Sequence, residues 1–167
     1  MKKREARVYE ALKSLNITYD QMNHSPAYTL EDCHKIVQSL GGGIHCKNLF
    51  LSNRQGTVFY LLLLRYDKKF RTAEVSKAIG QSRLSFGSDE QLLVHLDIHP
   101  GAVSPMGLVY DQENGVNLLI DQDLLSYKKI CFHPCVNTAT ISITMQDFLG
   151  IFLPFTGHEP TFITCSL

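Results

Sequence analysis

The longest apolar run of the chain, Val58 to Leu64, constrains the fold more than any other segment. Residues 53–56, Asn-Arg-Gln-Gly, have turn chemistry and separate it from a second apolar run, Lys47 to Ser52. Two such runs joined by a short polar turn predict a β-hairpin, with its second strand over Thr57 to Leu64. Because the apolar residues of that strand do not alternate with polar ones, we expect it to be buried on both faces.

Length and charge narrow the class of protein. The chain has 167 residues, 44% of them hydrophobic, which is typical of one compact domain spanning residues 1–167. No apolar run approaches the ~20 residues that cross a bilayer, so we expect a soluble, cytoplasmic protein with no membrane partner. Lys plus Arg (16) equals Asp plus Glu (16), and this balance excludes a global field for tight, sequence-blind nucleic-acid binding.

Capping patterns and the spacing of apolar residues predict several helices. The expected helices are residues 3–15; Thr29 to the glycines at 41–43; Thr72–Ile79; a helix from Ser88 that carries Leu92, Leu93 and Leu96 into the core; and a last helix from Thr144 through Leu153, which Pro154 stops. Apolar runs bounded by turn residues predict further strands. The expected strands are Gly107–Tyr110, Val116–Ile120, Lys129–His133, Thr138–Ile143 and a closing strand at Thr161–Thr164. These elements predict an α/β fold with a largely antiparallel or mixed sheet.

Cysteines and histidines do not form a convincing metal site. The five cysteines are an odd number without a CxxC pair, which argues against a disulfide framework and against a four-cysteine zinc site. Cys131, His133 and Cys135 alternate along a presumed strand and would share one face, but no second ligand pair lies at zinc spacing. We therefore expect no metal and no cofactor. Cys46 has no recognisable activating base, so covalent catalysis through its thiol is not expected.

One basic cluster leaves two interpretations open. Arg65, Lys68, Lys69 and Arg71 fall within seven residues, and Lys77 and Arg83 follow. A charge run of this kind is most often a solvated turn and helix face, and the alternative is a local contact with RNA.

Standard catalytic signatures are absent, because no Ser/His/Asp order, P-loop or HExxH pattern occurs. Several polar islands instead stand where a packed fold would favour apolar or simple turn residues. In chain order they are HSPAYT (24–29), KNLF (47–50), RLSF (83–86), GAVSPMGL (101–108), HPCVNTATI (133–141) and GHEP (157–160). Their order and spacing resemble the prolyl-tRNA editing family, the YbaK/ProX-type deacylases related to the insertion domain of bacterial prolyl-tRNA synthetase.

The resemblance implies a single YbaK-like α/β domain with a mixed, barrel-like sheet flanked by helices. It also implies trans-editing: hydrolysis of the ester between a wrong amino acid and the terminal adenosine of proline tRNA, with prolyl-tRNA synthetase as a further partner. The GHEP ending resembles the subgroup that removes alanine. Two alternatives remain, a cysteine-specific deacylase of the same family and a non-catalytic module that binds an aminoacyl or tRNA end. GAVSPMGL departs from the family's usual loop, and this departure bears on substrate selectivity.

The resemblance also assigns residues to the site. The expected catalytic set is Lys47, Gly101, Ser104 and His133, and the expected substrate-binding set is His24, Thr29, Asn48, Ala102, Pro105, Asn137, Thr138 and His158. Lys47 is a cation that could hold the terminal phosphate or ribose, and Gly101 lets backbone approach a ligand closely. Ester hydrolysis needs oxyanion stabilisation, which backbone amides supply when no nucleophile signature is present. Ser104 and Thr29 have competing structural interpretations, as a turn residue and as a helix cap.

Overall fold

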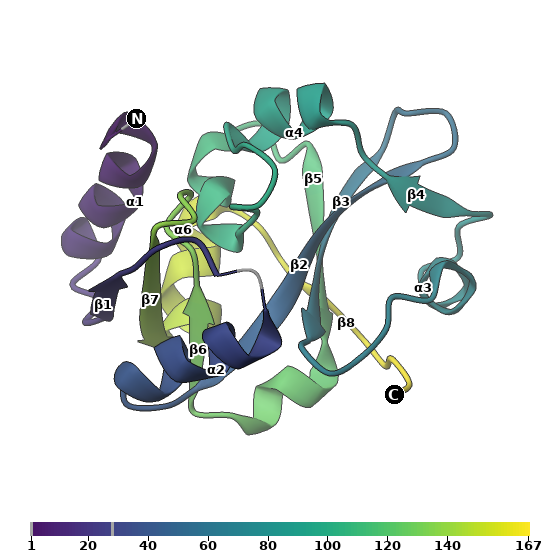
Figure 1. The fold of residues 1–167 in the computed structure, drawn as a ribbon. Coiled ribbons are helices and arrows are strands. Elements are labelled where there is room, and N and C mark those ends of the chain that lie inside the picture. The colour runs from purple at the N-terminus through teal and green to yellow at the C-terminus, as the bar shows by residue number, and fades with distance from the viewer. Residues whose placement is uncertain (1, 28) are drawn as a thin grey trace.

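A computed structural model describes residues 2–27 and 29–167, which form one eight-stranded mixed sheet with helices around it (Figure 1). The strands are β1 (Asp20–Asn23), β2 (Ile44–Asn53), β3 (Phe59–Arg65), β4 (Leu84–Phe86), β5 (Val116–Asp121), β6 (Lys129–Phe132), β7 (Ala139–Thr144) and β8 (Thr161–Ile163). The helices are α1 (Lys2–Ser14), α2 (Leu30–Ser39), α3 (Thr72–Ala78), α4 (Asp89–Leu96), α5 (Met145–Asp147) and α6 (Leu153–Thr156), with 3₁₀ turns at Pro105–Tyr110 and Gln122–Ser126. The α/β fold with a mixed, helix-flanked sheet is confirmed.

Strand β2 joins the two halves of this sheet. The strand order is β1-β7-β6-β2-β3-β5-β8, and β4 also pairs with β2. Along one edge, β2 is antiparallel to β3 from Cys46 to Ser52. Along its other edge, β2 pairs with β6 at its beginning, through Ile44 and His45, and with β4 at its end, from Leu51 to Asn53. Among the described strands, none covers residues 47–49 on that second edge.

The expected burial of the hairpin's second strand is confirmed. In β3 the residues Phe59, Leu61 and Leu63 belong to one hydrophobic cluster, and the residues between them, Tyr60, Leu62 and Leu64, belong to another. Alternate side chains of a strand point to opposite faces, so β3 contributes to a core on each side of the sheet. At about 1.5–3 kcal/mol for each fully buried large apolar side chain, this strand stabilises both halves of the fold.

Capping residues begin the helices where the sequence predicts. Thr29 precedes α2 and its hydroxyl accepts from the Asp32 N–H at 3.1 Å. Ser88 and Gln91 form a capping box at the start of α4. Leu92 and Leu96 of α4 are buried as expected, but Leu93 is 39% exposed, so its placement in the core was wrong. A helix of eight residues buries one narrow stripe, and Leu93 lies beside it.

One predicted strand and one predicted helix end are wrong, and in both cases the reason is the local backbone preference of a proline. Gly107–Tyr110 is part of a 3₁₀ turn, not a strand, because Ser104 caps its start and Pro105 fixes a helical φ at its first position. Pro154 does not stop the last helix. A π-turn at Phe148–Phe152 leads into α6, where the proline lies in the first turn and its missing N–H is tolerated. That helix ends at Gly157, whose φ of +77° provides a left-handed cap.

Strands β1 and β4 were not predicted, since Asp-Gln-Met-Asn in β1 and Leu-Ser-Phe in β4 do not form apolar runs bounded by turn residues. The strand predicted at Lys129–His133 ends at Phe132 instead. Cys135 lies beyond it with a left-handed φ of +65°, so the expected shared face of Cys131, His133 and Cys135 is wrong. Within the described chain, no helix is both long and apolar enough to span a membrane.

Lys68 is not a solvated member of the basic cluster. Its side chain is 1% exposed, and its Nζ donates to Asp121 at 2.9 Å, to Asp123 at 2.6 Å and to the Cys165 carbonyl at 2.7 Å. Burial works against the charge, but the hydrogen bonds to the two carboxylates outweigh it and raise the pKa of Lys68. This buried lysine ties the end of β3 to β5 and to the C-terminal segment.

Replacing Lys68 by Met should destabilise the protein by about 3–5 kcal/mol, because the fully buried Asp121 carboxylate would lose its charged partner. Urea unfolding followed by circular dichroism measures this loss. The matched control is Lys69→Met at the exposed neighbouring position, which should change the unfolding free energy by less than about 0.5 kcal/mol. Equal effects of the two substitutions would contradict the assigned role.

Candidate active site

A small cavity lies between α2 and the strands β2, β6 and β7. Its volume is about 80 Å³. Residues from five segments line it: Ala27; Cys33, Ile36 and Val37 of α2; His45, Cys46 and Asn48 of β2; Cys131, Phe132 and His133; and Thr140 of β7. The α2 residues are three and four positions apart and therefore share one helix face. The cavity thus collects residues from the islands at 24–29, 47–50 and 133–141.

His133 presents one ring nitrogen to this cavity in a defined state. Its Nδ1 lies 2.9 Å from the Ala139 carbonyl, which can only accept, so Nδ1 carries the proton and donates. Burial lowers the pKa of His133, against the opposing effect of that hydrogen bond. The neutral ring therefore has Nε2 as an acceptor, and among the described residues Nε2 has no hydrogen-bond partner.

His24 fastens the 24–29 segment to the same wall. Its backbone N–H donates to the Thr138 carbonyl at 2.9 Å. Its ring Nδ1 donates to the Ser25 carbonyl at 2.8 Å, which leaves Nε2 to accept from the Thr140 hydroxyl at 2.7 Å. The His24 and His133 ring centroids are 6.2 Å apart. Two islands that are distant in sequence therefore meet at one side of the cavity, although Tyr28 lies outside the described residues.

Lys47 and Asn48 lie on β2 but on opposite faces, as neighbouring strand residues do. Asn48 lines the cavity, and its Nδ2 donates to the Cys46 carbonyl at 3.3 Å. Lys47 is exposed, and its Nζ donates to the Lys68 carbonyl. The structure therefore places Lys47 on the neighbouring surface and not in the cavity wall.

The edge of β2 that faces away from β3 is open at this point. The Arg65 N–H donates to the Asp121 carboxylate of β5 and therefore points away from β2. Arg65 and its β2 partner Cys46 thus form a pair without backbone hydrogen bonds to each other. Even-numbered β2 residues then turn their backbone groups to the other edge, as Phe50 does by accepting from the Gly87 N–H at 2.9 Å. Asn48 lies between the stretches paired with β6 and with β4, so its backbone faces the open segment.

The loop at 101–105 leads into a capped 3₁₀ turn. Gly101 has a φ of +91°, a conformation that favours glycine, and a Cβ there would come within 3.8 Å of Asn137 Nδ2. Ala102 is buried. Ser104 is fully buried and its hydroxyl accepts from the Met106 N–H at 3.1 Å, which makes it the cap of the 3₁₀ turn that begins at Pro105. The loop thus lies beside Asn137, and Ser104 is occupied by a backbone contact.

Neither this loop and Asn137 nor the remaining expected residues belong to the lining of the cavity. Thr29 is the α2 cap, and Thr138 is exposed, with its carbonyl used by His24. His158 is 6% exposed, and its Nε2 lies 2.8 Å from the Asp111 carboxylate. That carboxylate also accepts from the N–H groups of Gly115 and Val116, so the GHEP island is part of a buried hydrogen-bond network.

Sequence reasoning missed most of the apolar and thiol lining of the cavity. The spacing of Cys33, Ile36 and Val37 indicates an inward-facing stripe on α2, but it does not show that this stripe lines a cavity instead of packing in the core. Cys46 is in the lining as well, and burial raises the pKa of its thiol strongly, so the thiol stays protonated. Within the described part of the chain, no group of three His, Cys, Asp or Glu residues could hold a metal ion.

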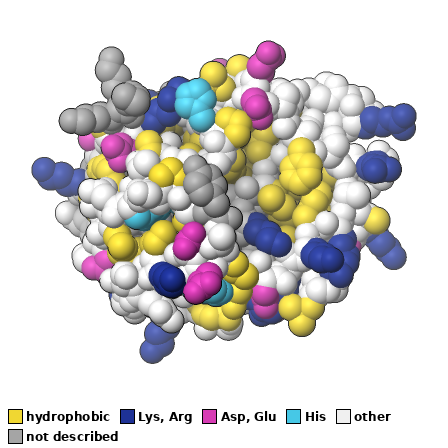
Figure 2. Space-filling view, in the orientation of Figure 1, with side chains coloured by type: hydrophobic (Ala, Val, Ile, Leu, Met, Phe, Trp, Pro, Cys, Tyr) yellow, Lys and Arg dark blue, Asp and Glu magenta, His cyan; other side chains and the backbone are white. Residues whose placement is uncertain are grey.

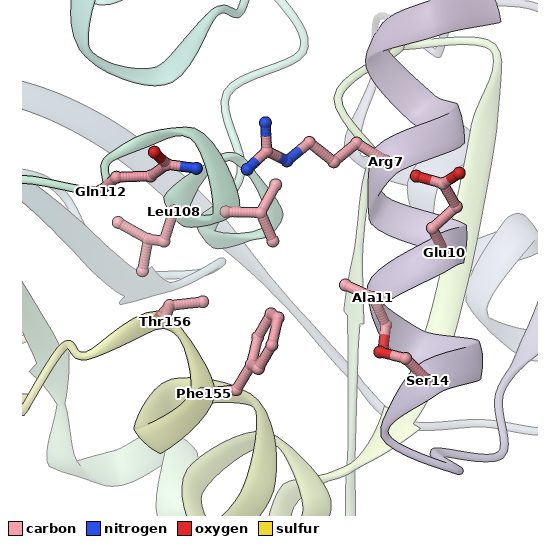
Figure 3. A pocket seen from close by; sticks show the side chains of 9 residues that line it. Arg7, Glu10, Ala11, Ser14, Leu108, Gln112, Phe155 and Thr156 are labelled. Carbon is pink, nitrogen blue, oxygen red and sulfur yellow. The ribbon is translucent and has the colours of Figure 1, made fainter.

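A second, larger groove of about 430 Å³ lies between α1, the 3₁₀ turn at 105–110 and α6. Figure 3 shows Arg7 of α1 extending toward Gln112, with the Phe155 ring between the two walls. None of the expected site residues lines this groove.

Comparison with known proteins favours one of these two cavities. A family model described as an aminoacyl-tRNA editing domain matches residues 24–151. The chain belongs to the aminoacyl-tRNA editing family. The small cavity is built within the matched segment, whereas α1 and α6, which frame the larger groove, lie outside it. We therefore take the small cavity as the candidate active site.

Individual relatives agree with the family assignment. The prolyl-tRNA editing protein ProX of Acetoanaerobium sticklandii is 33% identical over 141 residues, covering 84% of this chain and 85% of ProX. The prolyl-tRNA synthetase associated domain-containing protein 1 of Danio rerio is 34% identical, covering 93% of this chain and 84% of its own length. A solved structure described as a candidate trans-editing enzyme for prolyl-tRNA synthetase has the same fold, with a TM-score of 0.71, 18% identity and 98% of each chain covered.

A histidine pair beside the cavity provides a pH-dependent test of the site's packing. His45 Nε2 lies 3.3 Å from His34 Nδ1, and the His45 ring stacks on Tyr66 with centroids 4.6 Å apart. Burial, followed by the nearby His34, lowers the pKa of His45 to about 4. In the unfolded chain the same histidine titrates near pH ~6.5.

Between about pH 6.5 and 4 the unfolded state therefore binds more protons at His45 than the folded state does, so stability falls as the pH falls. The His45→Asn variant should lose less stability than the unchanged protein when the pH is lowered from 7 to 5, as measured by urea midpoints. His99→Asn, at an exposed histidine, is the control. A pH dependence that His45→Asn leaves intact would contradict the packing described.

Proposed function

We propose that this chain hydrolyses the ester that links alanine to the terminal adenosine of proline tRNA, and that it does so as an editing domain separate from the synthetase. The observation that carries the proposal is the small cavity of about 80 Å³, which brings together Ala27, Asn48, His133 and Thr140 from three of the family's islands. Membership of the aminoacyl-tRNA editing family supports the reaction type. The name of the ProX relative supports proline tRNA as the substrate.

The size of the cavity supports a small amino acid. A water molecule takes about 30 Å³ of liquid volume, so the cavity has room for a few heavy atoms. Rejecting a substrate by lost contacts contributes only ~1–3 kcal/mol for each methylene, which is too little to spare correctly charged tRNA. A rigid wall excludes the larger proline ring more strongly. Ile36, Val37 and Phe132 are buried apolar residues that supply such a wall.

The chemistry we infer uses water and backbone amides. Asn48 turns its backbone to the open edge of β2, and Gly101 has no Cβ to keep a substrate from its backbone. Backbone amides at these two places would stabilise the oxyanion that forms when water attacks the ester carbonyl. Nε2 of neutral His133 would accept a hydrogen bond from the substrate's amino group or from the attacking water. Lys47, on the neighbouring surface, would hold the terminal phosphate or ribose.

A thiol mechanism is disfavoured by the surroundings of Cys46. Its thiol is buried, which raises its pKa, and a protonated thiol is a poor nucleophile. Ser104 is an equally poor candidate because its hydroxyl accepts from a backbone N–H inside the fold. Both observations favour hydrolysis without a covalent intermediate.

The proposed function predicts a substrate order. Purified protein should deacylate alanine-charged proline tRNA faster than cysteine-charged proline tRNA, and should leave proline-charged proline tRNA intact. Release of the labelled amino acid measures each rate. Lys47→Ala should slow alanine release by roughly 100-fold, the loss typical of removing one stabilising polar group. Faster release of cysteine would assign the chain to the cysteine-specific subgroup, and no release from any charged tRNA would support a binding module.

Selectivity should depend on His133, because its ring forms part of the cavity wall. His133→Ala enlarges the cavity, so the variant should release proline from proline tRNA while its alanine activity falls. The ratio of the two deacylation rates measures the change. The control is His158→Ala, which removes a buried partner of Asp111 and should lower stability without changing that ratio. An unchanged ratio in His133→Ala would move selectivity to another part of the protein.

A further inference from the structure

Phe86 is an exposed aromatic residue that no part of the described fold covers. Its side chain is 63% exposed, although it is on a strand of the sheet. Among the described residues its ring contacts one other aromatic ring, that of Phe70, with centroids 5.5 Å apart and planes tilted by 58°. The two rings therefore adjoin each other at the surface, and adjoining exposed apolar side chains with polar residues around them are typical of interaction sites, unlike a single exposed ring.

This ring is on the same face of the sheet as Lys47. Odd-numbered residues of β2, namely Lys47, Leu49 and Leu51, share one face. In the pairing of β2 with β4, Leu51 lies opposite Phe86, so both point to that face. Leu49 and Phe70 both pack on the cluster that contains Leu51. From Lys47 to Phe86 the surface therefore runs along four residues of β2, roughly 13 Å.

Three cations belong to the segments that carry the two rings or pack against them: Lys69 precedes Phe70, Lys77 is on α3, which packs on β4, and Arg83 precedes β4. Lys69, Lys77 and Arg83 are exposed, and within the described part of the chain none of them forms an ion pair. The acid of α3, Glu74, is engaged by the Ser166 N–H at 3.0 Å. Figure 2 shows Lys and Arg side chains around exposed hydrophobic ones on the right-hand part of this face, over α3 and β4, while Asp and Glu side chains lie along its middle and left-hand parts. We call Phe70, Phe86, Lys69, Lys77 and Arg83 the Phe86 patch.

We propose that the Phe86 patch binds the unpaired 3′ end of tRNA, with Phe86 stacking on a base that precedes the terminal adenosine. The choice of tRNA rests on the proposed function. An aromatic ring flanked by unpaired cations is the arrangement that binds single-stranded nucleic acid, because the ring stacks on a base and the cations contact phosphates. Since the chain carries no net charge, binding must come from a local patch of this kind.

The position of the patch fits this occupant. It lies on the Lys47 face of β2, and Lys47 is next to Asn48 of the cavity wall. The cavity is on the opposite face, so a short single strand would run from Phe86 past Lys47 and over the open edge of β2, which would bring its terminal adenosine and the attached amino acid to the candidate site. A double-stranded stem lacks exposed base faces, so the unpaired end is the part of tRNA that an aromatic ring recognises.

The test compares two RNA hairpins that carry the acceptor stem of proline tRNA but no amino acid, one with the unpaired 3′ end and one without it. Fluorescence anisotropy measures their dissociation constants for the purified full-length protein. The unchanged protein should bind the complete hairpin more tightly than the trimmed one. Phe86→Ala should weaken binding of the complete hairpin by about tenfold, corresponding to ~1–3 kcal/mol for a base stacked on a ring, and should abolish the difference between the two RNAs.

Three variants separate stacking from folding and from charge. Phe86→Tyr keeps an aromatic ring and should restore binding. Phe162→Ala removes a ring that is 45% exposed on β8, beyond β3 and β5 in the sheet, and should change nothing. Arg83→Gln should lower the slope of log Kd against log salt by about 0.7, the value for one phosphate contact on a single strand. Phe86→Ala should leave that slope unchanged.

Binding of both hairpins with equal affinity by the unchanged protein would overturn the proposal, as would Phe86→Ala binding like the unchanged protein. A loss of self-association in Phe86→Ala, seen by analytical ultracentrifugation with RNA binding intact, would show a protein interface instead. Since neither hairpin carries an amino acid, no ester can be hydrolysed and these results do not depend on catalysis. Failure of the proposed function, seen as no deacylation of any charged tRNA, is thereby distinguishable from failure of this inference.

Discussion

The pairing of strand β2 determines the arrangement of everything else in the molecule. One of its edges is hydrogen-bonded to β3, which is buried on both faces. Its other edge is shared between β6 at the beginning and β4 at the end. Because these two partners leave a stretch between them uncovered, the strand that holds the sheet together also presents backbone groups at an opening. Asn48 lies in that stretch and in the cavity wall, while Lys47 points to the other side.

The parts of the fold that depend on local chemistry could be predicted from the sequence. The caps at Thr29 and Ser88 begin helices, and the apolar run of β3 lies inside the sheet, because capping and burial act within a few residues. Errors came where one residue type has two roles. Pro154 can end a helix or occupy its first turn, and which of these occurs depends on the preceding π-turn. Lys68 looks like a surface charge until Asp121, distant in sequence, is brought beside it by β3 and β5 pairing.

The candidate site also has residues that could be identified from the sequence and residues that could not. Polar residues that form recognisable islands, such as His24, Asn48 and His133, were identified from the sequence, and the fold brings these three segments to one cavity. The apolar lining from α2 was not identified, because nothing local distinguishes a helix face that contacts a cavity from one that contacts core. His158 shows the reverse case: its island is distinctive in sequence, yet its side chain is in a buried network with Asp111. A motif therefore indicates that a residue matters, and only the fold shows what it contacts.

The central claim is that the aminoacyl end of the substrate enters the small cavity beside the open edge of β2. The most direct measurement is a titration of isotope-labelled protein with a non-hydrolysable alanyl-adenosine analogue in which an amide replaces the ester, followed by backbone amide chemical shifts. We predict the largest shift changes at Asn48, Gly101 and His133. Changes confined to the groove of Arg7 and Phe155, with these three amides unaffected, would contradict the claim.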